Sequence, residues 1–283
     1  MALFDDILLT VDYDRTLTGP DSTIPERNLE AIRYFTENGG TFTLNTGRST
    51  TTMRDLFSVI PANAPFLLYN GSAFWENGKL TNLRIIDLPL WDTLLDVQQA
   101  FPEMNLEIQG AYNHYLLDPR PEFAALYDRM QWRWAPAVPG EDYGPFLKFA
   151  AYGIVRKSAL SDMYTTDPED MKRFDQLMEY ILTRWGDKVE VFLAAPRIVD
   201  VHAKGVSKCN AARTLQAQLG KKILVCVGDA ENDITMLDGA DYAFCPADGV
   251  VAARYETVCN CADGAVADVI YKKIPEILEK KRG

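Results

Sequence analysis

Histidine is scarce in this sequence, and positive charge is in deficit. Of 283 residues two are histidine, and 29 Lys and Arg stand against 40 Asp and Glu, a formal net charge of −11. With only His114 and His202 available, catalysis by histidine is not expected. The acidic balance argues against nucleic acid or an anionic membrane as a partner, because both bind broad basic surfaces. An anionic substrate stays possible, since a bound metal ion can invert the local field.

Cysteine pairs and long apolar segments are also missing. The five cysteines are odd in number, and none stands in the C-x-x-C spacing of many zinc sites. No stretch approaches the ~18 apolar residues of a membrane-spanning helix. The first residues carry two acids and no base before their apolar run, unlike a signal peptide. We therefore expect a soluble protein of the cytoplasm.

Length and composition are those of an ordinary globular protein. At roughly 150 residues per domain, the chain is long enough for two domains. Hydrophobic residues make up 47% of it and charged residues 24%, which excludes a disordered or fibrous chain. A chain of this size buries enough surface to fold without a disulfide or a structural metal.

Short apolar runs alternate with helical patterns at both ends of the chain. We predict strands at 7–11, 41–45, 65–69, 198–201, 222–227 and 242–245, and helices at 25–38, 53–59, 207–219, 232–237 and 265–278. The first helix is expected to begin at a capping box formed by Thr23 and Glu26. Strand, helix and strand joined by short loops form right-handed units with parallel strands. The pattern therefore predicts an α/β fold, a doubly wound parallel sheet of the Rossmann-like kind.

The middle of the chain has a different texture. Residues 84–196 hold four of the five Trp and irregular mixed runs, and a hairpin centred on Asn77-Gly78 is expected just before them. This segment is predicted to be an α+β domain inserted into the first one. Residues 1–83 and 197–283 would then form the core.

Acidic and polar side chains follow the predicted core strands. They are Asp12, Asp14, Thr46, Arg48, Asn70, Asp229, Asn232 and Asp233. Ligands of open parallel sheets bind just beyond the carboxyl ends of the strands. Four acids gathered there could not all ionise without a cation, and oxygen ligands of this kind suit Mg²⁺. The alternative is that each acid only caps its own loop.

These residues also carry a resemblance to a known family. In order along the chain stand Asp12-Tyr13-Asp14-Arg15-Thr16, Thr46 after a strand, Lys208 ahead of a helix, and Gly228-Asp229-Ala230-Glu231-Asn232-Asp233. The chain thereby resembles the haloacid dehalogenase-like (HAD) hydrolases, specifically the Cof-type phosphatases with an inserted α+β cap. Order and spacing agree from residue 7 to about residue 270. Each motif alone is weak, but four in order around such an insertion are specific.

The resemblance implies a catalytic role for four of these residues. Asp12 would attack phosphorus and form an aspartyl-phosphate, and Asp14 would protonate the leaving oxygen and later deprotonate water. Thr46 would donate a hydrogen bond to a phosphoryl oxygen, and Lys208 would neutralise charge on the transferring group. Lys204 is a rival for the last role, but Lys208 stands at the expected helix start.

The resemblance also implies a Mg²⁺ site and a substrate-binding set. The metal ligands would be the Asp12 carboxylate, the Asp14 backbone carbonyl and Asp229, with Asp233 in or next to the shell and Asn232 nearby. Substrate would contact Thr46, Gly47, Arg48, Asn70 and Lys208. Arg48 could equally be a structural ion-pair partner, and Asn70 with Gly71 could equally be a simple turn.

The sequence departs from the family pattern at three positions. Arg15 stands where Gly is usual, Asn45 replaces a common small residue before Thr46, and Cys209 follows Lys208 where Gly is usual. None of these changes removes a catalytic group. The backbone of the loop at Arg15 is the feature most open to change.

The expected activity is hydrolysis of phosphomonoesters with Mg²⁺ as cofactor. The partner would be a small phosphorylated metabolite, with sugar phosphates first and nucleotide-like phosphates second. A phosphomutase of the same family, which shares the aspartyl-phosphate step, is one alternative. A catalytically silent HAD-like regulatory or binding protein is another. The sequence gives no indication of oligomeric state.

Overall fold

The computed structural model describes residues 2–153, 168–195 and 198–282, and they fold into two compact units. Unit 1 comprises Met1–Gly47, Asp55–Thr81 and Ser207–Gly283, and unit 2 comprises Arg48–Arg54 and Asn82–Val206. The division predicted at residues 84 and 196 stays a prediction for the functional domains. The boundaries between the two compact units lie between residues 81 and 82 and between residues 206 and 207, and residues 48–54 also belong to unit 2.

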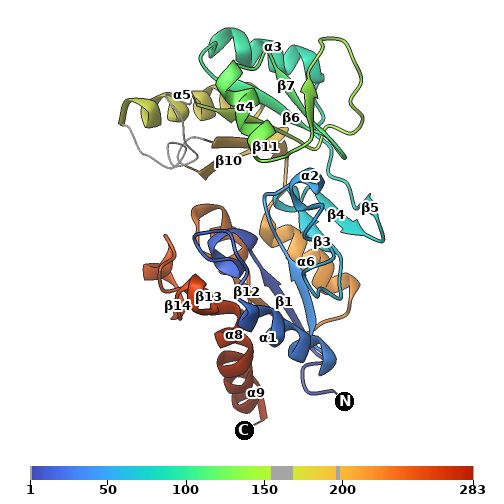
Figure 1. The fold of residues 1–283 in the computed structure, drawn as a ribbon, viewed down its shortest axis with the longest axis vertical. Coiled ribbons are helices and arrows are strands. Elements are labelled where there is room, and N and C mark those ends of the chain that lie inside the picture. Colours follow the sequence, from blue (N-terminus) through green and yellow to red (C-terminus); the bar gives the residue numbers. More distant parts are fainter. Residues whose placement is uncertain (1, 154–167, 196–197, 283) are drawn as a thin grey trace. The chain divides into compact units, whose positions relative to one another are not determined.

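Unit 1 carries both ends of the chain, drawn in blue and in orange to red in Figure 1. Its strands are β1 (Ile7–Val11), β2 (Thr41–Leu44), β3 (Phe66–Leu68), β4 (Ala73–Glu76), β5 (Lys79–Thr81), β12 (Ile223–Val227), β13 (Tyr242–Pro246) and β14 (Glu256–Val258). Its helices are α1 (Glu26–Glu37), α6 (Lys208–Gln218), α7 (Ile234–Asp238), α8 (Ala265–Asp268) and α9 (Ile274–Arg282).

The main sheet of unit 1 is parallel, with strand order β14-β13-β12-β1-β2. Its central strands β1 and β12 are buried along their whole length, as the unbroken apolar runs of the sequence predict. Leu8, Leu224 and Cys226 pack with α6 and α7 on one face. Since neighbouring side chains alternate between faces, Ile7 and Leu9 point to the other face, where α1 packs against α8 and β2. Helices on both faces confirm the doubly wound α/β fold.

The segment after β2 extends this sheet in a less regular way. A single parallel bridge joins Asn45 to Leu67 of β3, and β3, β4 and β5 form a separate antiparallel sheet. The predicted hairpin between β4 and β5 is confirmed. Asn77 and Gly78 both have positive φ, at 50° and 80°, as its two-residue turn requires.

Two details of the predicted helices are wrong. Helix α1 begins at Glu26 without a side-chain cap, because the hydroxyl of Thr23 donates to Asp21 over 2.7 Å instead. The helix predicted at 53–59 is a single turn, α2 (Thr50–Met53), followed by turns. Ser49 and Thr52 form its capping box, so the helix starts earlier than the apolar spacing suggested.

Unit 2 contains a six-stranded sheet and four helices among the residues described. The strands are β6 (Asn105–Gln109), β7 (His114–Leu117), β8 (Trp134–Pro136), β9 (Lys148–Tyr152), β10 (Val189–Ala195) and β11 (Ile198–Ala203). With α2, the helices are α3 (Leu90–Ala100), α4 (Pro121–Arg129) and α5 (Pro168–Trp185). The strand order is β10-β11-β9-β6-β7-β8, antiparallel except between β7 and β8.

The sheet of unit 2 has a core on each face. Apolar side chains of α3 and α5 cover one face, and those of α4 cover part of the other. The strand predicted at 198–201 forms, as β11, but its assignment to the parallel sheet is wrong, since β11 pairs antiparallel with β9 and β10. Burial along nearly its whole length suits a strand of either sheet, and only the pairing distinguishes them. In the described part of the chain, no helix is long and apolar enough to span a membrane.

Candidate active site

The parallel sheet brings three acids together at its carboxyl edge. β1 and β12 are neighbours in register, with Val11 opposite Val227, so Asp12 and Asp229 follow adjacent strand ends. Asp233 enters from the turn that precedes α7. Carboxylate oxygens of Asp12, Asp229 and Asp233 lie within 4.8 Å of one another, and all three side chains are buried.

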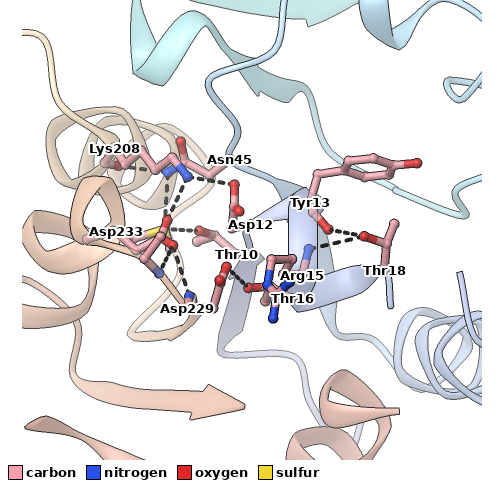
Figure 2. A network of polar contacts seen from close by, with 12 residues as sticks. Thr10, Asp12, Tyr13, Arg15, Thr16, Thr18, Asn45, Lys208, Asp229 and Asp233 are labelled. Atoms are coloured by element: carbon pink, nitrogen blue, oxygen red, sulfur yellow. Dashed lines mark hydrogen bonds and ion pairs between the residues drawn. The ribbon is translucent and has the colours of Figure 1, made fainter. Parts of the chain in front are cut away.

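A buried lysine pairs with two of these acids. Lys208 is the first residue of α6, and its Nζ lies 2.6 Å from Asp12 Oδ1 and 2.6 Å from Asp233 Oδ1 (Figure 2). The Lys208 side chain is fully buried, and a buried ammonium group needs paired partners of this kind. Lys204, the rival in the sequence, pairs instead with Glu190 of unit 2 and is half exposed. The structure thus brings Lys208 to the acids.

Hydrogen bonds from neighbouring groups fix two of the carboxylates. Thr16 Oγ1 donates to Asp229 Oδ1 over 2.8 Å, and Asp233 Oδ2 accepts the amides of Asp229 and Ala230 at 2.9 and 3.1 Å. A Cβ on Gly228 would lie 2.6 Å from Asp233 Cβ. Only glycine therefore fits at position 228, because the Asp233 side chain folds back onto that backbone. This contact of Thr16 was not predicted from the sequence, although Thr16 closes the first motif.

The crowding of negative charge shifts the ionisation of these groups. Burial, with Asp233, Asp229 and Asp14 adding to it, raises the pKa of Asp12 well above its usual range against the opposing effect of Lys208. Burial, followed by Asp233, raises the pKa of Asp229 to about 7. Burial would lower the pKa of Lys208, but Asp12 and Asp233 outweigh it and raise that pKa above its usual value. Three buried acids facing one lysine leave an excess of negative charge, which a divalent cation would neutralise.

The remaining residues of the first motif lie in a wide turn after β1, Tyr13–Leu17. Asp14 is half buried there, and Arg15 is exposed with φ 56°, ψ 12°, in the left-handed region. The backbone N–H of Arg15 donates to Thr18 Oγ1 over 3.1 Å, and the Thr18 hydroxyl donates to the Tyr13 carbonyl over 3.2 Å (Figure 2). The loop at Arg15 therefore has the conformation that glycine adopts most easily, and the arginine occupies it without a change of fold.

The second motif lies beside the first. The amide of Asn45 donates to the Val11 carbonyl over 2.9 Å, so Thr46 follows β2 next to the end of β1. The amide of Asn70 donates to the Thr46 carbonyl, also over 2.9 Å, and both side chains are buried. A Cβ on Gly47 would lie 2.9 Å from Asn70 Oδ1, so glycine allows this close approach. Thr46, Gly47 and Asn70 form one polar group after β2 and β3.

Asn45, one of the departures from the family pattern, has a structural role here. Its side-chain Nδ2 donates to the Lys208 carbonyl oxygen over 2.8 Å, and Met236 Sδ lies 3.4 Å away (Figure 2). The side chain thus links β2 to the first residue of α6, whose ammonium group contacts the acids. The sequence could not predict this role of Asn45, because its partner Lys208 is 163 residues away in the chain.

Three other candidates have different surroundings. Arg48 belongs to unit 2, whereas the acids belong to unit 1. Asn232 is half buried beside Asp233 in the turn before α7. Cys209 fits in place of glycine because Gly239 faces it, and a Cβ on Gly239 would lie 2.1 Å from its Sγ. Cys209 and the other four cysteines are free thiols.

Unit 1 is thus a doubly wound parallel sheet with a buried acidic cluster at its carboxyl edge, the place where open α/β sheets bind their ligands. Residues 9–270 match the family model described as haloacid dehalogenase-like hydrolase. The chain belongs to this family, and the resemblance noted in the sequence is confirmed.

Relatives and solved structures of similar length agree. The chain is 24% identical over 263 residues to the 5-amino-6-(5-phospho-D-ribitylamino)uracil phosphatase YcsE of Bacillus subtilis, covering 91% of this chain and 92% of YcsE. A haloacid dehalogenase-like hydrolase from Bacteroides thetaiotaomicron has the same fold, with a TM-score of 0.75, 18% identity, and 94% and 98% of the two chains covered. The HAD subclass IIB sugar phosphatase BT4131 also has this fold, with a TM-score of 0.72 and 17% identity, and the match covers 95% of this chain and 99% of BT4131.

Proposed function

We propose that this protein is a Mg²⁺-dependent phosphatase that hydrolyses phosphomonoesters of small metabolites, sugar phosphates first, through an aspartyl-phosphate on Asp12. The observation that carries the proposal is the buried cluster of Asp12, Asp229 and Asp233, which Lys208 contacts on one side. A phosphatase is also the activity in the name of YcsE, and a sugar phosphatase is the activity in the name of BT4131.

The residues present fit a magnesium ion. The ligands would be the carboxylates of Asp12 and Asp229 and the backbone carbonyl of Asp14, with Asp233 in or next to the shell. Burial and mutual repulsion raise the pKa of Asp12 and of Asp229, so the ionised cluster gains from a cation. When bound, Mg²⁺ would let a carboxylate approach an anionic phosphate and would stabilise the charge that develops.

The chain's own groups would carry the two chemical steps. A carboxylate oxygen of Asp12 bonds to phosphorus as the bond from phosphorus to the leaving oxygen breaks, and Asp14 gives its proton to that oxygen. In the second step Asp14 takes a proton from water, whose oxygen bonds to phosphorus. The bond between phosphorus and Asp12 then breaks, which releases phosphate and restores the free carboxylate.

Lys208 and Thr46 would stabilise the transferring group. Lys208 Nζ already contacts Asp12 at 2.6 Å, so a phosphoryl group bonded to Asp12 would be within reach of its positive charge. Thr46 follows β2 beside the end of β1, where its hydroxyl could donate to a phosphoryl oxygen. Gly47 and Asn70, next to it, and Arg48 complete the proposed substrate-binding set.

Selectivity among metabolites is proposed to come from residues 84–196, the inserted domain of the sequence analysis. Its strands carry polar side chains on one face, such as Gln109, Lys148 and His202, which lie opposite one another in neighbouring strands. Side chains of this domain could recognise the leaving group. A cytoplasmic location is also proposed, supported by the five free cysteines.

A screen of phosphorylated metabolites for phosphate release, with and without Mg²⁺, tests the proposal. We expect release that depends on Mg²⁺ and stops in excess chelator. Conversion of a sugar 1-phosphate to the 6-phosphate without phosphate release would indicate a phosphomutase instead. No metal-dependent release from any compound of a broad panel would indicate a silent regulatory or binding protein.

A further inference from the structure

A buried chain of three polar side chains crosses unit 2, and the proposed chemistry does not use it. Ser49 Oγ lies 2.6 Å from His114 Nε2, and His114 Nδ1 lies 2.5 Å from Glu107 Oε1. The relative exposures of these residues are 1%, 1% and 0%. Ser49 caps α2, His114 begins β7, and Glu107 stands in the middle of β6.

Glu107 is a fixed ionised partner at the end of this chain. Its Oε2 accepts hydrogen bonds from Gln109 Nε2 at 3.0 Å and from the Tyr152 hydroxyl at 2.8 Å. Burial alone would raise its pKa, but His114, followed by the hydrogen bond from Gln109, outweighs burial and lowers the pKa to about 2. Because a carboxylate only accepts, the hydrogen between it and His114 resides on Nδ1, and this contact fixes the orientation of the ring.

A serine, a histidine and an acid in this order also form the nucleophilic triad of many hydrolases. Here the serine hydroxyl is enclosed and already used. Ser49 Oγ accepts the amide of Thr52 at 3.2 Å, and Thr52 Oγ1 accepts the amide of Ser49 at 3.1 Å. A buried hydroxyl that caps a helix is a structural link, whereas a nucleophile has to meet substrate. The arrangement therefore favours a clamp over a second catalytic centre.

A second contact lies one residue further on. Thr50 Oγ1 donates to the carbonyl of Ala111, in the turn that joins β6 to β7. Two consecutive residues of the Arg48–Arg54 segment are thus held by the β6–β7 hairpin. These contacts account for an unusual feature of the chain: the segment belongs to unit 2, although Gly47 before it and Asp55 after it belong to unit 1.

We propose that His114 is a positioning residue. By holding Ser49 it fixes the Arg48–Arg54 segment to the sheet of unit 2, and it thereby sets the place of Arg48, the second residue after Thr46. This inference rests on the proposed function, in which Arg48 contacts the substrate. His114 itself touches no reacting group, so its loss should weaken substrate binding and leave the chemical groups of unit 1 in place.

Amide hydrogen exchange tests the clamp without any activity. We expect His114→Gln to raise exchange over residues 49–54 about tenfold, the effect of losing one hydrogen bond of ordinary strength, and Ser49→Ala, which also loses the bond from the Thr52 amide, to raise it at least as much. The matched control is Thr52→Val, which removes the contacts of the Thr52 hydroxyl with Ser49 but leaves Ser49 and His114 in contact. Amide exchange over residues 49–54 should rise less in Thr52→Val than in Ser49→Ala. Ser49→Ala leaves the contact of Glu107 with His114 intact, so it decides the question if His114→Gln does not fold.

Kinetics on a metabolite that the wild type hydrolyses tests the consequence. We expect Ser49→Ala and His114→Gln to raise KM about tenfold with kcat little changed. In an Arg48→Ala background neither change should raise KM further, because the segment then carries no substrate contact to misplace. The conservative variant Ser49→Thr retains the hydroxyl, so its KM should equal that of the wild type.

Three results would overturn the inference. They are unchanged exchange over residues 49–54 in Ser49→Ala, full additivity with Arg48→Ala, and labelling of Ser49 by a fluorophosphonate, which would reveal a nucleophile. If the protein hydrolyses no phosphomonoester, the proposed function fails, but the exchange experiment still decides whether the clamp exists.

Discussion

Replacement of Asp229 by Asn should stabilise the metal-free protein at pH 8 while it abolishes phosphatase activity. Asp229 is 3% exposed, and its carboxylate lies within 4.8 Å of those of Asp12 and Asp233. Its ionised form is therefore held in the folded protein at a cost. An amide of the same shape can still accept the hydrogen bond from Thr16, but it carries no charge.

The size of the effect follows from the pKa of Asp229. Burial, and after it Asp233, raises that pKa from 3.8 to about 7. At about 1.4 kcal/mol per pH unit, this lowers the free energy of unfolding by about 4 kcal/mol once the group is fully ionised. Because the folded pKa is the higher one, the loss begins as pH rises above 3.8 and is complete above about 7.

The assay is urea unfolding in excess chelator at several pH values between 5 and 8. The free energy of unfolding of Asp229→Asn should exceed that of the wild type by a margin that grows with pH and reaches about 4 kcal/mol at pH 8. Addition of Mg²⁺ should stabilise the wild type by mass action and leave the variant unchanged. Asp248→Asn is the matched control, because hydrogen bonds to Cys261 outweigh partial burial and lower the pKa of that exposed acid. Removal of the Asp248 charge should therefore not raise the free energy of unfolding.

Equal stability of Asp229→Asn and the wild type at pH 8 in chelator would refute the electrostatic account of the cluster. So would a difference that does not change between pH 5 and pH 8. Full activity of Asp229→Asn would remove the residue from the proposed metal site.

Three further predictions concern other residues. Asp14→Asn should accumulate phosphorylated Asp12 from an aryl phosphate, because an acidic phenol leaves without protonation while hydrolysis of the intermediate loses the roughly 10²–10⁴-fold help of a general base. Asp12→Asn should give no adduct. Intact-protein mass after acid quench measures both, and a phosphate adduct on Asp12→Asn would contradict the mechanism. Arg15→Gly should leave the fold unchanged and raise the free energy of unfolding by up to about 1 kcal/mol, because φ 56° is strained for arginine; a loss of stability in urea unfolding would disprove this. Burial, and then Lys148, lowers the pKa of His202 well below 6.5, so the wild type should lose stability as pH falls below 6.5 and His202→Gln should lose less; parallel losses in thermal unfolding from pH 7 to pH 5 would contradict it.

Much of the fold could be predicted because its signals are local. The five-residue runs at β1 and β12 are apolar except for Thr10, and an acid stands one or two residues after each, which predicts buried parallel strands with their polar ends at one edge. The hairpin was predictable because Asn77-Gly78 suits only a few backbone conformations. The sheet to which β11 belongs was not predictable, since a strand buried along nearly its whole length can pair in either sheet until its neighbours are known.

For the candidate site, the sequence by itself determined which acids follow which strands, because that depends on neighbours in the chain. The expected helix start already favoured Lys208 over Lys204, but only the tertiary structure shows its contact with Asp12, which joins residues 196 positions apart. The same holds for Asn45, which reaches the carbonyl of Lys208, and for the link from Ser49 through His114 to unit 2. Hydrogen bonds and ion pairs of this kind depend on which surfaces the packed core brings within about 3 Å of each other, and no local pattern records that distance.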